Sequence, residues 1–187
     1  MPETVVRPAP SNPVAPRIAI VGSGFAGIGM AIRLQQMGIT SFTIYEAAAD
    51  IGGTWRDNTY PGAACDVPSH LYSFSFEPNP AWSRAFGGQA EIFAYLKHCA
   101  RKYGVERYVR CHARVASTRF DESRQVWHVE VDVNGIRETI EADIVIAASG
   151  PLPTPLINVV DFRTGVPLLS YTRTAPRRSP GAVGVNV

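Results

Sequence analysis

The chain has 187 residues, 45% of them hydrophobic and 18% charged, which is enough to bury the core of one ordinary domain. No apolar run approaches the length of a membrane span and the first residues lack a secretory signal pattern, so we expect a cytoplasmic protein without a membrane-spanning segment. The three scattered cysteines form no Cys-x-x-Cys pair, which argues against a zinc site or a redox dithiol and predicts no bound metal.

Composition divides the chain into three parts. Residues 1–16 contain five prolines and few large apolar residues, and we expect a disordered leader there. Residues 17–155 carry the periodic segments and are predicted to form a single domain. Residues 156–187 are an irregular basic tail: four arginines and no acidic residue follow Asp161, so the part after Asp161 carries +4 in a chain whose net charge is only +2.

The domain begins with a short apolar strand, Ile18–Val21, that runs directly into Gly-x-Gly-x-x-Gly. In a dinucleotide-binding turn each glycine has a mechanical role: Gly22 allows the tight turn, Gly24 lets a pyrophosphate approach the backbone, and Gly27 lets helix and strand pack closely. The helix predicted over residues 27–37 would present its N-terminal amides to the phosphates. The alternative is a glycine-rich turn without a ligand.

A second apolar strand, Phe42–Tyr45, supports the dinucleotide interpretation. It ends at Glu46, about twenty residues past the turn, where an acidic residue that accepts hydrogen bonds from ribose hydroxyls is expected.

Residues 47–83 are rich in Gly, Pro and aromatic residues and lack periodicity, which is unusual for a loop of this length unless it is functional. A glycine pair at residues 52–53 permits close approach of the backbone to a ligand. Packing against a large planar cofactor, or a hydrophobic cluster beneath the loop, would each explain the aromatic side chains. These are Trp55, Tyr60, Tyr72, Phe74 and Phe76.

The remaining elements complete an α/β domain. A helix is predicted over residues 89–103, with Gly104 as its stop, and the period changes to two from Tyr108 onward. Strands over 118–120, 126–133 and 137–140, with turns between them, predict a small antiparallel β-meander. A buried strand over 142–148 is expected to return to the main sheet beside the first strand. The fold class is therefore a Rossmann-like domain, a parallel sheet with flanking helices, and an inserted meander.

Several of these motifs together resemble the N-terminal FAD-binding part of flavoprotein monooxygenases. The resemblance is closest to the Baeyer–Villiger type and the related flavin-containing monooxygenases, and it covers about residues 17–155. The motifs are Gly-Ser-Gly-Phe-Ala-Gly, Glu46, Gly-Gly-Thr-Trp, Tyr-Pro-Gly, Asp66, residues 71–76 and Ala-Ser-Gly-Pro-Leu at 148–152.

The resemblance implies FAD as the cofactor. In full-length members NADPH reduces the flavin and O₂ then forms a C4a-peroxyflavin, which inserts oxygen into a ketone or oxidises an amine or sulfide. Their partners are therefore a small-molecule substrate and O₂.

The resemblance also implies roles for individual residues. The pyrophosphate would be held at Gly22, Gly24, Phe25, Ala26 and Gly27, and Glu46 would bind the ribose of the adenosine. Gly53, Thr54, Trp55 and Tyr72 would lie along the flavin side, Val115 would meet the adenine through its backbone, and Gly150 would close the section. Asp66, the candidate catalytic residue, would be a partly buried carboxylate near the flavin and the nicotinamide, with Ala64 and Cys65 alongside. The alternative for Asp66 is a loop-capping aspartate.

Full-length members continue with a Phe-x-Gly-x-x-x-His motif, a second glycine turn for NADPH and a later arginine, and this sequence contains none of them. One hypothesis is that the tail is read out of frame or truncated, so that the chain is an incomplete, non-catalytic FAD-binding fragment. The alternative is a basic tail that binds an anionic partner. Because its arginines are not interleaved with aromatic residues, we expect no nucleic-acid partner. Sequencing the DNA across residues 159–170 tests the frame.

Overall fold

The computed structural model describes residues 15–150 and the backbone of two short strands, β8 (Val159–Val160) and β9 (Pro167–Leu169), which pair antiparallel. The disordered leader, and the basic tail apart from those two strands, are predictions that lie outside the described residues.

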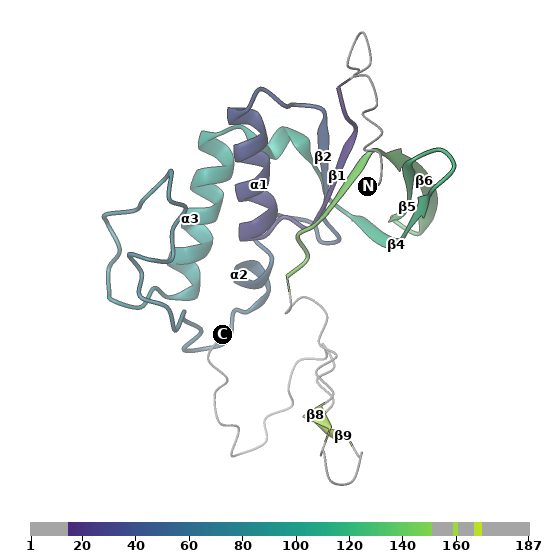
Figure 1. The fold of residues 1–187 in the computed structure, drawn as a ribbon. Coiled ribbons are helices and arrows are strands. Elements are labelled where there is room, and N and C mark those ends of the chain that lie inside the picture. The colour runs from purple at the N-terminus through teal and green to yellow at the C-terminus, as the bar shows by residue number, and fades with distance from the viewer. Residues whose placement is uncertain (1–14, 151–158, 161–166, 170–187) are drawn as a thin grey trace, which may run out of the picture.

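The described residues form three layers, seen in Figure 1 as helices, a parallel sheet and a separate antiparallel sheet. The predicted α/β class, with a parallel sheet and an antiparallel meander, is confirmed. In chain order the elements are β1 (Ile18–Val21), α1 (Phe25–Gln36), β2 (Phe42–Tyr45), α2 (Thr54–Asp57), α3 (Gln89–Lys102), the 3-10 helix η1 (Val105–Tyr108), β3 (Val109–Arg110), β4 (Ala113–Asp121), β5 (Val126–Val133), β6 (Ile136–Ala142) and β7 (Ile144–Ala147).

The parallel sheet has the order β3-β2-β1-β7, and β7 pairs with β1 as the sequence predicted. Because all four strands run the same way, the carboxyl ends of β1, β2 and β7 lie at one edge of the sheet. That edge brings Gly22, Glu46 and Ala148 together, although they are far apart in the sequence. It is the edge at which ligands bind in open α/β sheets.

The central strands β1 and β2 are buried on both faces, whereas the edge strand β7, predicted to be buried, is partly exposed, with Ile144 43% exposed. Ile18 and Ile20 of β1 belong to the core on the helix side, whereas Ala19 between them belongs to the core on the side of the antiparallel sheet. This alternation follows from the two-residue period of a strand. The predicted apolar face of α1 is buried in full, at Ile28, Ala31, Ile32 and Leu34.

Several boundaries differ from the sequence predictions, and two of the differences have a local cause. α1 begins at Phe25 rather than Gly27, because the amide of Ile28 already donates to Gly24 O, 3.0 Å away. The period-two run that starts at Tyr108 is divided between two sheets: β3 pairs parallel with β2, and β4 starts the antiparallel sheet. The chain turns between them at His112, whose φ is +53°.

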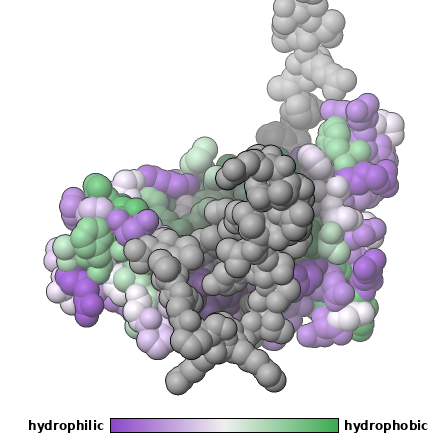
Figure 2. Space-filling view, turned by 90° about the horizontal axis from the view of Figure 1, so that it is seen from below, coloured by the Kyte–Doolittle hydropathy of each residue, from purple (hydrophilic) through white to green (hydrophobic). Residues whose placement is uncertain are grey.

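The long loop between α2 and α3 turns some aromatic residues inward and leaves other apolar side chains at the surface. Tyr60, Leu71 and Phe86 are 46%, 66% and 48% exposed. Figure 2 shows hydrophobic residues on this side of the molecule, mixed with hydrophilic ones. None of the described helices, of which α1 and α3 are the longest, is long and apolar enough to cross a membrane.

Replacing Ile20 by alanine tests the two-sided core. Ile20 is fully buried in β1, so we expect Ile20→Ala to lower the free energy of unfolding by about 2–5 kcal/mol through lost burial and a residual cavity. Urea denaturation followed by far-UV circular dichroism measures the change. Ile136→Ala is the matched control, because Ile136 is 74% exposed. Equal effects of the two substitutions would contradict the described core.

Candidate dinucleotide-binding site

The turn between β1 and α1 is shaped by two glycines that cannot carry side chains. Gly22 has a φ of +99°, and a Cβ there would lie 2.8 Å from the carbonyl oxygen of Ala148. A Cβ on Gly27 would lie 2.0 Å from the carbonyl oxygen of Gly22. Both glycines are therefore required by packing between the strands and the helix, independently of any ligand.

Gly24 is different, because its position leaves space for an approaching group. Its φ is −78°, and the nearest atom to an added Cβ is the Cα of Gly53, 3.8 Å away. The first helical hydrogen bond of α1 is donated by Ile28, so the amides of residues 25–27 precede it. α1 has no acidic residue in its first turn, so the positive end of its dipole is not offset there.

The Gly52-Gly53 pair lies directly on this turn. The amide of Gly52 donates to the carbonyl oxygen of Ser23, 2.9 Å away, and a Cβ on Gly53 would lie 3.1 Å from the Cα of Gly24. Gly53 has a φ of +52° and precedes α2, so Thr54 is placed beside the turn as well. The two glycine motifs therefore form one continuous piece of backbone surface.

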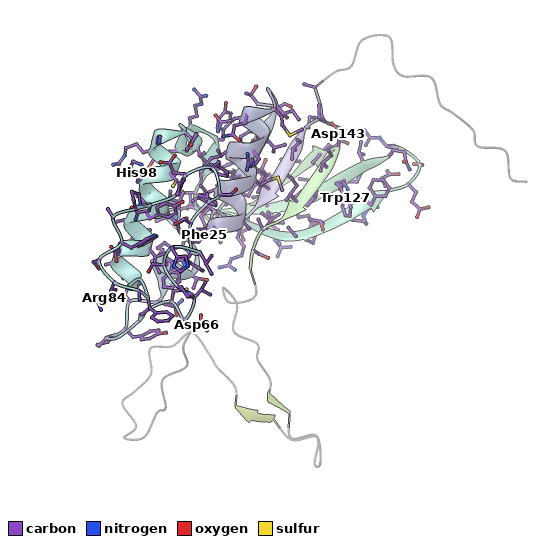
Figure 3. All side chains as sticks on the ribbon, turned by 60° about the vertical axis from the view of Figure 1, so that its left-hand side comes forward. Phe25, Asp66, Arg84, His98, Trp127 and Asp143 are labelled. Carbon is purple, nitrogen blue, oxygen red and sulfur yellow. The ribbon has the colours of Figure 1, made fainter. Side chains whose placement is uncertain are left out.

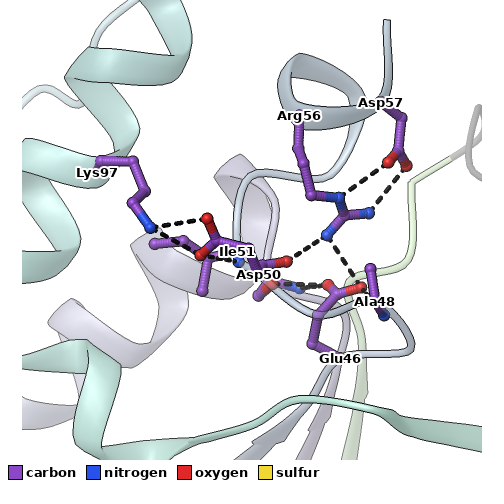
Figure 4. Close-up of polar contacts among 8 residues, drawn as sticks. Glu46, Ala48, Asp50, Ile51, Arg56, Asp57 and Lys97 are labelled. Carbon is purple, nitrogen blue, oxygen red and sulfur yellow. Dashed lines mark hydrogen bonds and ion pairs between the residues drawn. The ribbon is translucent and has the colours of Figure 1, made fainter.

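Glu46, at the end of β2, is buried and accepts hydrogen bonds from the turn. Its side chain is only 7% exposed. Oε2 accepts from the amide of Ser23 at 3.1 Å and from the Ser23 hydroxyl at 2.6 Å. Oε1 accepts from the amide of Ala48 at 2.9 Å and lies 3.1 Å from Nη1 of Arg56 (Figure 4). The carboxylate is thus held in one orientation from two sides.

Arg56 extends this contact toward α3. Its Nε and Nη2 donate to the two carboxylate oxygens of Asp57, each at 2.8 Å, and its Nη1 also donates to the carbonyl oxygen of Asp50. Asp50 in turn accepts from Nζ of Lys97 on α3, at 2.7 and 2.9 Å (Figure 4). Burial lowers the pKa of Arg56, but its ion pairs with Asp57 and Glu46 outweigh this and raise it. The guanidinium is therefore charged.

Three of the aromatic residues predicted at the site contact one another. Trp55 is only 3% exposed and donates from Nε1 to the hydroxyl of Tyr72, 3.0 Å away. The rings of Tyr72 and Phe25 meet edge to face, with centroids 4.8 Å apart. Figure 3 shows Phe25 at the start of α1, on the side of the long loop. These contacts join the loop to the first turn of α1.

Two other aromatic residues of the loop, Phe74 and Phe76, are explained by packing within the protein, whereas Tyr60 is exposed. Phe74 and Phe76 stack with centroids 5.0 Å apart, and Phe74 also contacts Phe25. The hydroxyl of Tyr95 on α3 accepts from the amide of Phe74 at 2.8 Å. Phe74 and Phe76 thus form the hydrophobic cluster beneath the loop that was the alternative interpretation, and no cofactor is needed to account for them.

Asp66 is exposed, so the expectation that its carboxylate is partly buried was wrong. The segment before it pairs with the chain leading into α3: Ala64 bridges Gly88, and the amide of Cys65 donates to Gly87 O at 2.9 Å. Cys65 is buried, whereas Asp66 lies in a bend and is exposed (Figure 3). Burial raises the pKa of the Cys65 thiol.

Val115 and Gly150 lie on either side of the central strands. Val115 is half-buried in β4, where the register with β5 shifts, two residues beyond Ala113, whose amide donates to Glu46 O at 2.9 Å. Gly150 has a φ of +68° and follows Ala148, which packs beneath Gly22. Ala26 is exposed in the first turn of α1. The adenine and flavin contacts of these residues stay predictions.

The sequence interpretation did not include Arg56, whose guanidinium pairs with the Glu46 carboxylate. The sequence places Arg56 directly after Gly-Gly-Thr-Trp and ten residues beyond Glu46. No rule of residue spacing predicts that these two side chains contact each other.

Comparison with known proteins agrees with this geometry. Residues 20–88 match the NAD(P)-binding Rossmann-like domain family. The chain is 50% identical over 141 residues to a Baeyer–Villiger monooxygenase of Streptomyces coelicolor and 46% identical over 149 residues to one of Pseudomonas aeruginosa. This chain is homologous to one part of the Baeyer–Villiger monooxygenases. The two matches cover 75% and 80% of the chain but only 26% and 28% of the relatives, so it spans about a quarter of their length.

Solved structures of related enzymes share the fold. An oxidised steroid monooxygenase bound to NADP superposes with a TM-score of 0.67 at 37% identity, over 74% of this chain and 26% of that one. OTEMO in complex with FAD and NADP gives a TM-score of 0.69 at 29% identity, over 80% of this chain and 28% of that one. The similarity to the Baeyer–Villiger enzymes therefore holds in three dimensions.

Replacing Gly27 tests the close packing of α1 on β1. Alanine is the better helix former by about 1 kcal/mol, yet its Cβ would lie 2.0 Å from a backbone oxygen that cannot move freely. We expect Gly27→Ala to destabilise the chain by about 1–3 kcal/mol or more. Chemical denaturation measures this. Gly88→Ala, whose Cβ would meet no atom within 4 Å, is the control. A stabilised Gly27→Ala variant would refute the described packing.

Proposed function

We propose that this chain binds FAD and is the flavin-binding part of an NADPH-dependent monooxygenase. The observation that carries the proposal is the turn at Gly24, where an open cradle, the free amides of α1 and the buried Glu46 carboxylate meet at the carboxyl edge of the sheet. FAD and NADP are bound by OTEMO, which shares the fold.

The residues present fit such a group. The amides of Phe25, Ala26 and Gly27 would hold the pyrophosphate, with no side chain at Gly24 to block it. Glu46 would accept from the adenosine ribose, and Val115 would face the adenine. Gly53, Thr54, Trp55, Tyr72, Ala64, Cys65, Asp66 and Gly150 are proposed toward the flavin.

When bound, FAD supplies the redox chemistry for activating O₂, and the protein supplies position and exclusion of water. Trp55 and Tyr72 contribute rigidity, because their hydrogen bond and their contact with Phe25 fix the loop against α1. Asp66 is exposed, so its carboxylate is accessible from solvent.

The activity of the complete enzyme is part of the proposal. It would use NADPH, O₂ and a small-molecule ketone, amine or sulfide, and act in the cytoplasm. Because the chain spans only about a quarter of its relatives, the second candidate is a non-catalytic FAD-binding chain. An NADPH oxidation assay on the flavin-loaded protein separates the two: turnover favours the monooxygenase and its absence favours the binding chain.

A single methyl group at Gly24 tests the cofactor site. Gly24 and Gly88 precede α1 and α3 with φ of −78° and −76°, and in both cases a Cβ meets no protein atom closer than 3.8 Å. Both alanine variants should therefore fold. We expect Gly24→Ala to weaken FAD binding at least about tenfold, because the methyl group occupies the phosphate approach, while Gly88→Ala binds normally.

FAD binding to the full chain is measured by visible absorption of the co-eluting flavin and by titration of flavin fluorescence. Equal affinity of Gly24→Ala and Gly88→Ala would contradict the site, and wild-type protein that takes up no FAD would contradict the function.

A further inference from the structure

We propose that Arg56 is a positioning residue that aims one carboxylate oxygen of Glu46 at the ribose of the bound adenosine. The proposal rests on the FAD-binding function above and assigns a task to a side chain outside the expected set of site residues. It follows from how the donors are shared between the two oxygens of Glu46.

The carboxylate of Glu46 has about four acceptor positions, and the protein supplies four donors. Two donors, the amide of Ala48 and Nη1 of Arg56, lie on Oε1. The other two, the amide and hydroxyl of Ser23, lie on Oε2. A ribose hydroxyl can donate to Glu46 only if one of these four donors releases its hydrogen bond to the carboxylate.

The hydroxyl of Ser23 is the donor whose hydrogen bond to Glu46 is most easily released. An amide hydrogen is fixed by the backbone, and the guanidinium of Arg56 is anchored elsewhere, but a hydroxyl hydrogen turns about its own Cβ–Oγ bond. Oε2, which faces the glycine turn through Ser23, is therefore the oxygen open to the ribose. Oε1 stays with the amide of Ala48 and with Arg56.

Arg56 suits this task because its own position is fixed from three directions. The side chain is only 16% exposed, its fork is bound by both oxygens of Asp57, and Nη1 also reaches Asp50 O. A planar guanidinium satisfies all of these acceptors at once, whereas a lysine ammonium cannot match a bidentate carboxylate. Without Arg56, Oε1 keeps only the Ala48 amide, and the carboxylate is free to rotate about its χ3.

The test uses ADP and 2′,3′-dideoxy-ADP as probes, with the full chain and binding measured by calorimetry. ADP carries the pyrophosphate and the ribose hydroxyls, and the dideoxy compound lacks only the hydroxyls. We expect Arg56→Met to weaken ADP binding about tenfold and dideoxy-ADP binding by less than about twofold. Arg56→Lys should give a smaller loss, about threefold, again confined to ADP. Arg124→Met, which removes an exposed arginine paired with Glu141, is the control and should change neither.

A general loosening of the site would weaken the binding of both nucleotides equally, and that result would overturn the proposal. ADP binding that is unchanged or tighter would overturn it as well.

A double-mutant cycle adds a second criterion: if Arg56 acts through Glu46, Arg56→Met has no further effect on ADP binding in a Glu46→Gln background. Additive losses would overturn the proposal. Where Arg56→Met fails to fold, Arg56→Lys and its Glu46→Gln combination decide by the same criteria. Wild-type protein that binds neither nucleotide would instead contradict the proposed FAD-binding function.

Discussion

The close approach of α1 to β1 is the constraint on which the rest of this structure depends. A methyl group at Gly27 would lie 2.0 Å from the carbonyl oxygen of Gly22, so the helix can sit this near the strand only with glycine there. The same turn receives Ala148 at the end of β7 and Gly53 before α2. Three segments from distant parts of the chain thus meet at glycine backbone, and the first amides of α1 point into the space that results.

The sequence predicted this part of the molecule well, because each step is local. β1, β2, the buried face of α1 and the helix over residues 89–102 follow from apolar periodicity and from glycine as a stop. The return of β7 beside β1 follows from the handedness and adjacency rules for parallel strands. The three glycines were assigned roles by a motif whose physical basis is backbone geometry. The structure confirms the packing roles of Gly22 and Gly27 directly.

The parts that sequence could not predict depend on contacts between distant residues. The aromatic residues of the long loop are equally compatible with a cofactor and with a buried cluster, and only the stacking of Phe74 on Phe76 beneath the loop distinguishes these for two of them. The exposure of Asp66 depends on the pairing of residues 63–65 with the start of α3. The split between β3 and β4 depends on a left-handed residue, His112, that period-two patterning does not reveal.

The polar network around Glu46 connects the site to parts of the domain outside the glycine turn. Removing one member of a buried ion pair leaves the other charge without a partner, and such losses typically exceed what the intact pair contributes to stability. Glu46 is buried and Arg56 is mostly buried, and through Asp50 the pair is connected to Lys97 of α3. The orientation of the carboxylate is thus set by packing of α3 against the loop as much as by the turn itself. The short motif Gly-x-Gly-x-x-Gly does not by itself reproduce this site, since without Arg56 and its partners Glu46 would keep only the donors of Ser23 and Ala48.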